Sequence, residues 1–174
     1  MKTIYLVTHG PTFSNTSDPV MAPEGRNMIE SLKKKLPEYL PDGPAEVFAG
    51  TGRRQWQVAQ ILGFTADQVI FSDIWGGAAT IGDCKDVIIL GHGLSINRKN
   101  YLSIQDIQPY GKKVAALPDK ALICSGRPVL VRLGMREENC SSGALYALHV
   151  QDGEKVEIEL LIPGVCLLEQ MEQK

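Results

Sequence analysis

Two apolar runs of the sequence end in the same His-Gly pair, and they constrain the fold more than any other feature. Residues 4–10 read Ile-Tyr-Leu-Val-Thr-His-Gly, and residues 87–93 read Val-Ile-Ile-Leu-Gly-His-Gly. Apolar, β-branched runs of this length are typical of strands buried in a parallel sheet. Because ligands bind at the carboxyl ends of such strands, we expect His9 and His92 to face one pocket. Either histidine alone could instead satisfy a hydrogen bond at the end of its strand.

The residues that follow His9 supply the groups of an oxyanion cradle. Gly10 lets a ligand come close to the backbone, and Thr12 and Asn15 add a hydroxyl and an amide to a loop with free N–H groups. Hydroxyl and amide side chains also fill ordinary turns, so this alternative stays open.

Two arginines open a helix that we predict over residues 52–62, after a short strand at 45–49. Positive charge is disfavoured at a helix N-terminus unless an anion binds there. Arg53 and Arg54 therefore indicate an anion site, the alternative being that both side chains are solvated.

These motifs, in this order, resemble those of the histidine phosphatase superfamily, which includes the cofactor-dependent phosphoglycerate mutases. The family's Arg-His-Gly-x-Thr-x-x-Asn is similar to Thr-His-Gly-Pro-Thr-Phe-Ser-Asn at 8–15, and its Leu-Thr-x-x-Gly to Met-Ala-Pro-Glu-Gly at 21–25. Its Ser-Ser-Pro-Leu-x-Arg-Ala-x-Gln-Thr-Ala is similar to residues 49–59, and its Ser-His-Gly to Gly-His-Gly at 91–93. The resemblance covers roughly residues 1–97.

The resemblance implies a phosphoglycerate mutase-like α/β fold, with three layers and a mostly parallel central sheet flanked by helices. It implies that His9 accepts a phosphoryl group as the nucleophile, and that Arg54 and His92 act with it in catalysis. Contacts to the substrate phosphate would come from residues around the nucleophile, namely Thr8, Gly10, Thr12, Asn15 and Gly93. No metal and no other cofactor is implied, and the sequence has neither His-Glu-x-x-His nor Cys-x-x-Cys.

Thr8 stands where the family has an arginine that grips the phosphoryl oxygens. A threonine offers one neutral hydrogen bond in place of a charged, planar fork. The loss would cost about 2–4 kcal/mol of transition-state stabilisation, by analogy with the removal of one preorganised oxyanion donor. Arg53 and Lys2 are the candidates to replace it.

The family's acidic proton donor has no clear counterpart, because only residues 64–86 lie between the Arg54 helix and the second His-Gly strand. Asp73 is our first choice as proton donor, since it follows the apolar run 69–71 where a strand should end. The alternative, which we favour for this residue, is that Asp73 caps the Gly-rich turn after it.

Three interpretations of the function follow. The first is a metal-independent phosphatase that hydrolyses a phosphomonoester or phosphoramidate through a phosphohistidine on His9. The second is a catalytically degenerate family member, a pseudoenzyme that binds a phosphorylated ligand or partner protein without turnover. A mutase is disfavoured because the segment that usually supplies extra basic contacts is missing. The third interpretation is a serine hydrolase that uses Ser95, but the sequence around this residue lacks the Gly-x-Ser-x-Gly elbow.

The rest of the chain is interpreted from its patterns as one domain over residues 1–174. Apolar periodicity predicts the following elements: strands at 2–8, 69–72 and 86–91, helices at 24–36 and, as an option, 94–104, and a loop at 109–120. The final third, about 121–165, is typical of a β-rich extension with strands at 121–124, 128–133, 144–150 and 155–162. We expect these to be antiparallel strands, joined at the sheet edge or forming a small appendage, with a hairpin turn at Asp152-Gly153.

The composition of the chain limits the kinds of molecule that the protein is expected to bind. The 174 residues carry a net charge of −2 with both signs dispersed, which gives no footing for nucleic-acid binding. With no signal peptide, no membrane-spanning run and four scattered cysteines, we expect a cytoplasmic protein with free thiols. Its partner would be a small phosphorylated substrate or a phosphoprotein, and its late strands could pair across a homodimer.

Overall fold

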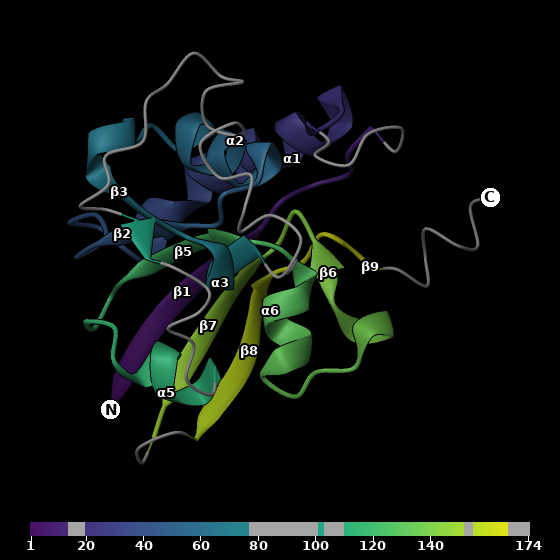
Figure 1. The fold of residues 1–174 in the computed structure, drawn as a ribbon. Coiled ribbons are helices and arrows are strands. Elements are labelled where there is room, and N and C mark those ends of the chain that lie inside the picture. The colour runs from purple at the N-terminus through teal and green to yellow at the C-terminus, as the bar shows by residue number, and fades with distance from the viewer. Residues whose placement is uncertain (14–19, 77–100, 103–109, 152–154, 167–174) are drawn as a thin grey trace.

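The computed structural model describes residues 1–13, 20–76, 101–102, 110–151 and 155–166 (Figure 1). Within these ranges, one sheet runs in the order β4-β3-β2-β5-β1-β7-β8. Its strands are β1 (Lys2–Thr8), β2 (Val47–Ala49), β3 (Val69–Ser72), β4 (Tyr101–Leu102), β5 (Leu122–Ser125), β7 (Leu145–Val150) and β8 (Val156–Ile162). A second, two-stranded sheet pairs β6 (Ser141–Ser142) with β9 (Val165–Cys166).

The large sheet is mostly parallel. Strands β1, β5, β2, β3 and β4 run in one direction, and β7 and β8 add an antiparallel pair beside β1. The carboxyl ends of β1, β5, β2 and β3 therefore meet at one edge of the sheet. This is the mostly parallel α/β arrangement with antiparallel strands late in the chain that the sequence predicts.

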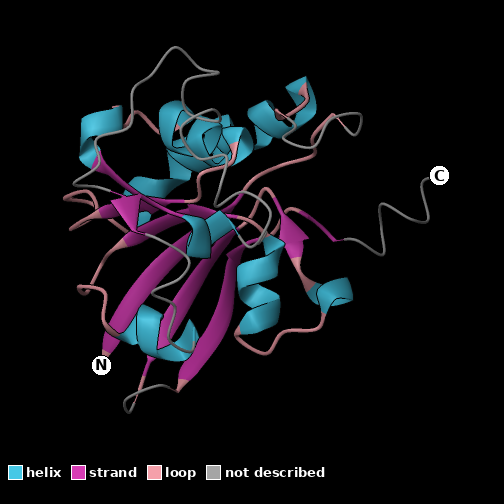
Figure 2. Cartoon of the chain, viewed as in Figure 1, coloured by secondary structure: helices cyan, strands magenta, loops and turns pink. Residues whose placement is uncertain are grey.

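Helices cover both faces of the sheet (Figure 2). One face packs against α1 (Pro23–Lys35) and α2 (Arg53–Ile61), and the other against α3 (Asp73–Gly76), α5 (Tyr110–Ala115) and α6 (Arg127–Arg132). Short 3-10 helices lie at Leu36–Glu38, Ala66–Gln68 and Glu137–Asn139.

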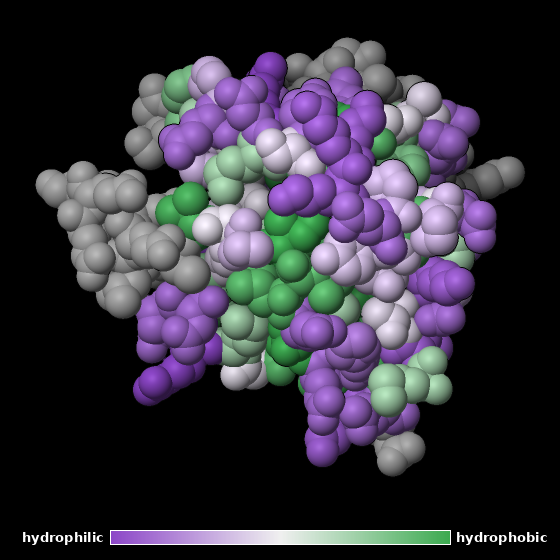
Figure 3. All heavy atoms as spheres, turned by 180° about the vertical axis from the view of Figure 1, so that it is seen from behind, coloured by the Kyte–Doolittle hydropathy of each residue, from purple (hydrophilic) through white to green (hydrophobic). Residues whose placement is uncertain are grey.

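Alternate residues of the strands contribute to two cores. In β1, Val7 joins the core under α1 and α2, whereas Ile4 and Leu6 join the core under α3, α5 and α6, and all three are fully buried. Burying such a side chain stabilises the fold by about 1.5–3 kcal/mol. On the side opposite to the view of Figure 1, hydrophobic atoms form a central band bordered by hydrophilic residues (Figure 3).

The amino-terminal half follows the predicted pattern. The expected elements at 2–8, 24–36, 45–49, 52–62 and 69–72 correspond to β1, α1, β2, α2 and β3. The hairpin also exists, because β7 and β8 pair antiparallel, although residues 152–154 are outside the described ranges. The predicted strand at 86–91 lies outside them as well.

Three predictions for the later part of the chain are wrong. Residues 127–132 form helix α6 instead of a strand at 128–133, and residues 110–115 form helix α5 inside the expected loop. Pro128 fits the first turn of α6, where its missing N–H is not needed. The optional helix at 94–104 fails at Tyr101 and Leu102, which form β4.

The position of β5 is the most consequential difference. It is parallel to β1 and β2 and lies between them, whereas the sequence pattern predicts an antiparallel strand at the edge or in an appendage. Local pattern shows that a strand exists at 122–125 but carries no information on its partners, which the whole sheet decides.

No helix among the described residues is long and apolar enough to cross a membrane.

Candidate active site

His9 follows directly after β1 and is held by the segments on both sides. Its N–H donates to the carbonyl of Ser125 at 3.0 Å, and its own carbonyl accepts from the N–H of Gly143 at 3.0 Å. Both neighbours belong to ordered parts of the fold, so the backbone of His9 is fixed before any ligand arrives. These bonds fix the point from which the His9 side chain projects, which helps to preorganise it for chemistry.

The hydrogen bonds of the His9 ring assign its tautomer. Nδ1 lies 2.9 Å from the carbonyl oxygen of Gly10. Because a carbonyl only accepts, Nδ1 must carry the proton, and the lone pair is left on Nε2. Arg54 donates its Nε–H to this Nε2 at 3.2 Å. The ring therefore turns its unprotonated nitrogen toward a guanidinium.

The surroundings keep the ring neutral. Burial, the charge of Arg54 and, more weakly, the charge of Arg127 lower the pKa of His9 to about 4, against a smaller opposing effect of the hydrogen bond to Gly10. At neutral pH the imidazole is unprotonated, which is the form that a nucleophile requires.

Arg54 reaches His9 because strand β2 lies next to β5 and delivers α2 to the same edge of the sheet. The loop between β2 and α2 is tied to β5, where the N–H of Gly50 donates to the carbonyl of Cys124 at 3.1 Å. A Cβ on Gly52 would overlap the side chain of Gln55 and lie 3.2 Å from Nη1 of Arg54. A residue with a Cβ at this helix entry would therefore require the side chain of Gln55 to move.

The loop after His9 packs on the start of α1 through two glycines. A Cβ on Gly10 would overlap the backbone of Gly25, and a Cβ on Gly25 would overlap Pro11. Thr12 forms a β-bridge with Met21, whose N–H donates to Oε1 of Gln57 at 2.7 Å. The first, second and third motifs of the sequence thus meet in one packed unit.

Thr8 has a different role from the one predicted for it. Its hydroxyl donates to the carbonyl of Ser141 at 2.7 Å and accepts from the N–H of Ala144 at 3.0 Å, and the residue is fully buried. The single hydroxyl proton is therefore already used. Thr8 fastens the 141–144 loop, the loop that also donates to the backbone of His9, instead of facing a ligand.

A second arginine beside His9 is absent from the sequence-based predictions. Strand β5 ends at Ser125, paired with Thr8, and is followed by Gly126 and Arg127. A Cβ on Gly126 would lie 3.0 Å from Nε2 of His9, and the charge of Arg127 is felt by the ring. The sequence contains this arginine in the Ser-Gly-Arg-Pro run, but only the pairing of β5 with β1 shows that it lies near His9.

The remaining predicted site residues are distributed differently. Asn15, His92 and Gly93 lie outside the described residues, and so does the side chain of Asp73. The backbone of Asp73 begins α3 after β3, three strands from β1, or roughly 14 Å across the sheet at about 4.8 Å per strand. Its role as proton donor stays a prediction.

Lys2 is not a substitute for the missing arginine. It lies at the opposite end of β1 from His9, where its Nζ donates to the carbonyl of Ala115 at 2.7 Å. Among the described residues, no cluster of three or more His, Cys, Asp or Glu side chains could hold a metal ion.

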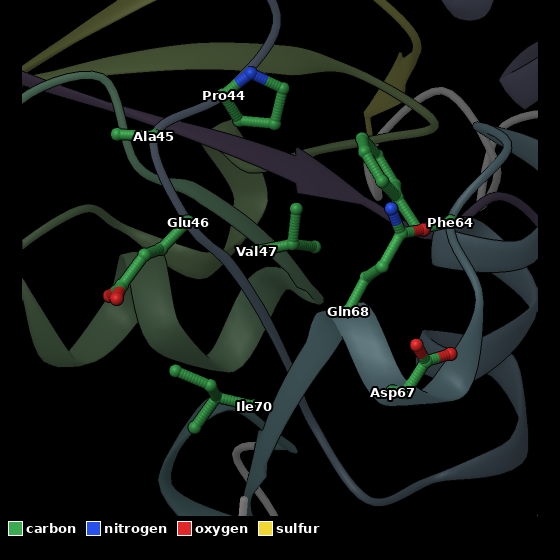
Figure 4. A pocket seen from close by; sticks show the side chains of 8 residues that line it. All are labelled: Pro44, Ala45, Glu46, Val47, Phe64, Asp67, Gln68 and Ile70. Carbon is green, nitrogen blue, oxygen red and sulfur yellow. The ribbon is translucent and has the colours of Figure 1, made fainter.

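A surface pocket of about 440 Å³ lies at the other edge of the sheet, at the start of β2 and β3 (Figure 4). Its lining includes the carboxylates of Glu46 and Asp67 beside apolar side chains such as Phe64 and Ile70. The two carboxylates would repel a phosphate, and none of the lining residues carries a positive charge. We therefore place the candidate active site at His9 and not in this pocket.

Comparisons with known proteins agree with this fold. No family model and no curated protein sequence matches the chain. Among solved structures, TTHB049 from Thermus thermophilus is 16% identical, with a TM-score of 0.54 over 94% of this chain and 99% of that one. The candidate phosphohistidine phosphatase SixA from Agrobacterium tumefaciens is 14% identical, with a TM-score of 0.56 over 94% and 99% of the two chains.

A third solved structure is the mycobacterial glucosyl-3-phosphoglycerate phosphatase. It is 13% identical, with a TM-score of 0.51 over 95% of this chain and 100% of that one. At these identities the likeness shows the fold. The chain has the phosphoglycerate mutase-like α/β fold of these structures.

Proposed function

We propose that this protein is a metal-independent phosphatase that hydrolyses a phosphomonoester or phosphoramidate through a phosphohistidine on His9. One observation carries the proposal: Nε2 of a neutral, preorganised His9 lies 3.2 Å from the guanidinium Nε of Arg54. A nucleophile next to a permanent positive charge is what phosphoryl transfer needs, because negative charge on the phosphoryl oxygens must be stabilised in the transition state.

The reaction would run in two steps. First, the lone pair of Nε2 forms an N–P bond while the bond from phosphorus to the leaving group breaks, and Nδ1–H stays bonded to the carbonyl of Gly10. Second, water attacks phosphorus, the N–P bond breaks and its electrons return to Nε2, and the proton of the attacking water leaves with solvent. The products are orthophosphate and the free alcohol or amine.

In this scheme Arg54 moves from His9 to the phosphoryl oxygens when substrate binds. The hydrogen bond from Arg54 to Nε2 occupies the lone pair in the free protein. An incoming phosphate offers the guanidinium a charge-assisted, stronger acceptor. Substrate binding would thus release the lone pair and stabilise the developing charge in one movement.

The substrate would be a small phosphorylated molecule or a phosphoprotein. The leaving group would need a proton unless it is already a good one, and Asp73 is our candidate donor. Phosphoramidates and activated esters need less protonation, so they are the substrates on which the proposed chemistry depends least on this residue. Two structural neighbours that carry phosphatase names support the proposal through the fold they share with this chain.

One observation favours the second candidate function, a binding protein without turnover. The position before the nucleophile holds Thr8, whose hydroxyl is wholly engaged with the 141–144 loop. A pocket with a single guanidinium would bind phosphate without stabilising the transition state enough for catalysis. The presence of Arg127 beside His9 argues against this alternative.

The test is hydrolysis of an activated aryl phosphate by the purified protein, with and without a chelator, beside His9→Ala and a control, His149→Ala. His149 is bonded to Thr3 and Glu159 on the β1–β7–β8 part of the sheet, away from the site. We expect chelator-resistant turnover that is lost in His9→Ala and kept in His149→Ala. Turnover that survives in His9→Ala, or no turnover in the wild type, would refute the proposal.

A further inference from the structure

The end of strand β5 lies directly beside the nucleophile. Ser125 pairs with Thr8 in parallel register, and its carbonyl accepts the N–H of His9 at 3.0 Å. The chain then continues through Gly126 into Arg127, the first residue of α6. The position beside His9 on this neighbouring strand therefore holds a glycine followed by an arginine.

Gly126 sets how closely this segment approaches the ring. A Cβ at this position would lie 3.0 Å from Nε2 and 3.1 Å from Cδ2 of His9, which is tighter than ordinary packing. The contact is with the edge of the ring that carries the lone pair. The absence of a side chain at 126 thus leaves that edge open while the backbone brings Arg127 next to it.

The side chain of Arg127 has an unused donor. Its Nη1 is buried and has no hydrogen-bond partner in the described part of the chain. A buried donor without an acceptor is unfavourable. The residue as a whole is partly exposed.

The next two arginines along the chain, Arg132 and Arg136, interact with side chains of the protein itself. Arg132, in the same helix, donates to the hydroxyl of Tyr110 at 2.8 Å and lies over its ring. Arg136 is exposed and forms an ion pair with Glu138 at 3.5 Å. Arg127 differs from both because it combines a buried, unpartnered nitrogen with a position beside the nucleophile.

We propose that Arg127 binds the phosphoryl group on His9 from α6, on the face of the sheet opposite to α2 and Arg54, and supplies the second guanidinium that Thr8 does not. This inference rests on the proposed function of His9 but concerns binding, which can be measured without turnover. An anion between Arg54 and Arg127 gives the buried Nη1 its acceptor, and two planar donors match the oxygens of a phosphate better than one. Arg127 is then a catalytic residue, because it touches the group that is transferred.

The experiment measures orthophosphate binding by nuclear magnetic resonance of the histidine side chains, with turnover measured separately. The chain has three histidines, so the His9 signal is assigned as the one missing from His9→Ala. The variants are Arg127→Met, Arg127→Lys and the control Arg136→Met, which removes an exposed arginine that is paired elsewhere. Thermal melts verify that each variant is folded.

We expect Arg127→Met to weaken orthophosphate binding about 10- to 100-fold, as for the loss of a hydrogen bond between charged groups. Arg127→Lys should recover part of this loss, since it keeps the charge without the fork, and Arg136→Met should bind as the wild type. Independently, the pKa of His9 should rise in Arg127→Met, because a cation that opposes protonation is gone.

The outcomes separate the two proposals. Unchanged orthophosphate binding in a folded Arg127→Met, or no binding in the wild type, would overturn the role of Arg127. Binding that depends on Arg127 without any turnover in the wild type would support the anion site and refute the phosphatase. Turnover that depends on His9 but is indifferent to Arg127→Met would leave the phosphatase standing and overturn this inference.

Discussion

The ends of β1 and β5 lie side by side at one edge of the sheet, yet they contribute to the site in opposite ways. Strand β1 leads into His9, the proposed nucleophile, while the residue before it, Thr8, is fully engaged in holding a loop. Strand β5 supplies no imidazole at its end, but Gly126 and Arg127 bring a positive charge to His9.

The difference shows that either of two neighbouring strands can supply a positive charge to the same site. Carboxyl ends of adjacent parallel strands meet at one edge, about 4.8 Å apart. A guanidinium from either strand can therefore reach the same phosphoryl group. On the proposal made above, a threonine before His9 is compatible with a pocket that holds two arginines, one from α2 and one from α6.

The largest effect is expected from Arg54, which donates to His9 from helix α2. Arg54→Met removes the donor to Nε2 of His9, and we expect kcat/KM to fall about 10²- to 10³-fold. Arg53→Met, one residue earlier in the same helix turn, is the matched control and should lose less than about tenfold. Equal losses in the two variants would mean that general positive charge at α2 matters, and not the contact with His9.

Thr8 should matter for stability more than for binding. Thr8→Arg places a long cation in a fully buried position and breaks both hydrogen bonds, so we expect it to cost about 3 kcal/mol or more of unfolding free energy. Thr8→Val should cost about 1–3 kcal/mol, because two buried backbone groups lose their partner, and Thr8→Ser should cost less. Denaturant unfolding measures all three.

The Thr8→Arg variant also tests whether a side chain at position 8 of β1 can reach the pocket. A folded Thr8→Arg protein with higher turnover would show that this side chain reaches the pocket, which contradicts the arrangement described above. A destabilised protein without any gain in turnover is the expected result.

The pH dependence follows from the lowered pKa of His9. Its value of about 4 in the folded state lies below the ordinary 6.5, so the unfolded chain binds the proton more readily. The contribution to stability is then fully present above about pH 6.5 and decreases as the pH falls toward 4, by about 3 kcal/mol. His9→Asn should lack this decrease when unfolding is measured across the same pH range.

The same shift predicts the acid limb of activity. If neutral His9 is the nucleophile, its protonation reduces kcat/KM only near pH 4 and not near pH 6.5. A kinetic pKa near 6.5 that is independent of the substrate's own ionisation would contradict the lowered pKa of His9.

The smallest effect is expected from Gly126, which follows β5 and lies beside the His9 ring. Gly126→Ala would put a methyl group 3.0 Å from Nε2 of His9, and we expect turnover to fall severalfold with a change in unfolding free energy of about 1 kcal/mol. Gly134→Ala makes a poor control because its φ is positive, at 110°. Ala115→Ser, in α5, is more suitable. Wild-type turnover in Gly126→Ala would show that the ring does not need this edge open.

The part of the site that depends on local pattern could be predicted from the sequence. His9, Gly10 and Arg54 can be identified because a strand followed by His-Gly and a helix opened by arginines are both readable along the chain. The packing of Gly10 on Gly25 joins the His-Gly motif to the motif at residues 21–25. The prediction of a mostly parallel sheet is confirmed by the order and direction of its strands.

The part that depends on strand partners could not be predicted. Residues 122–125 look like any buried strand, and only their pairing with both β1 and β2 makes Arg127 a neighbour of His9. The Val-Leu-Val run of α6 favours a strand locally, but Pro128 and the core that the segment joins decide for a helix. The two buried hydrogen bonds of Thr8 likewise come from the distant residues Ser141 and Ala144.

The central claim is that His9 carries the phosphoryl group, and trapping that intermediate tests it most directly. Protein mixed with an activated aryl phosphate is quenched in alkali, which preserves an N–P bond, and its intact mass and peptides are measured. The account predicts a gain of one phosphoryl group, located on the peptide that contains His9 and absent from His9→Ala. Orthophosphate release without any adduct on His9, or an adduct on another residue, would contradict it.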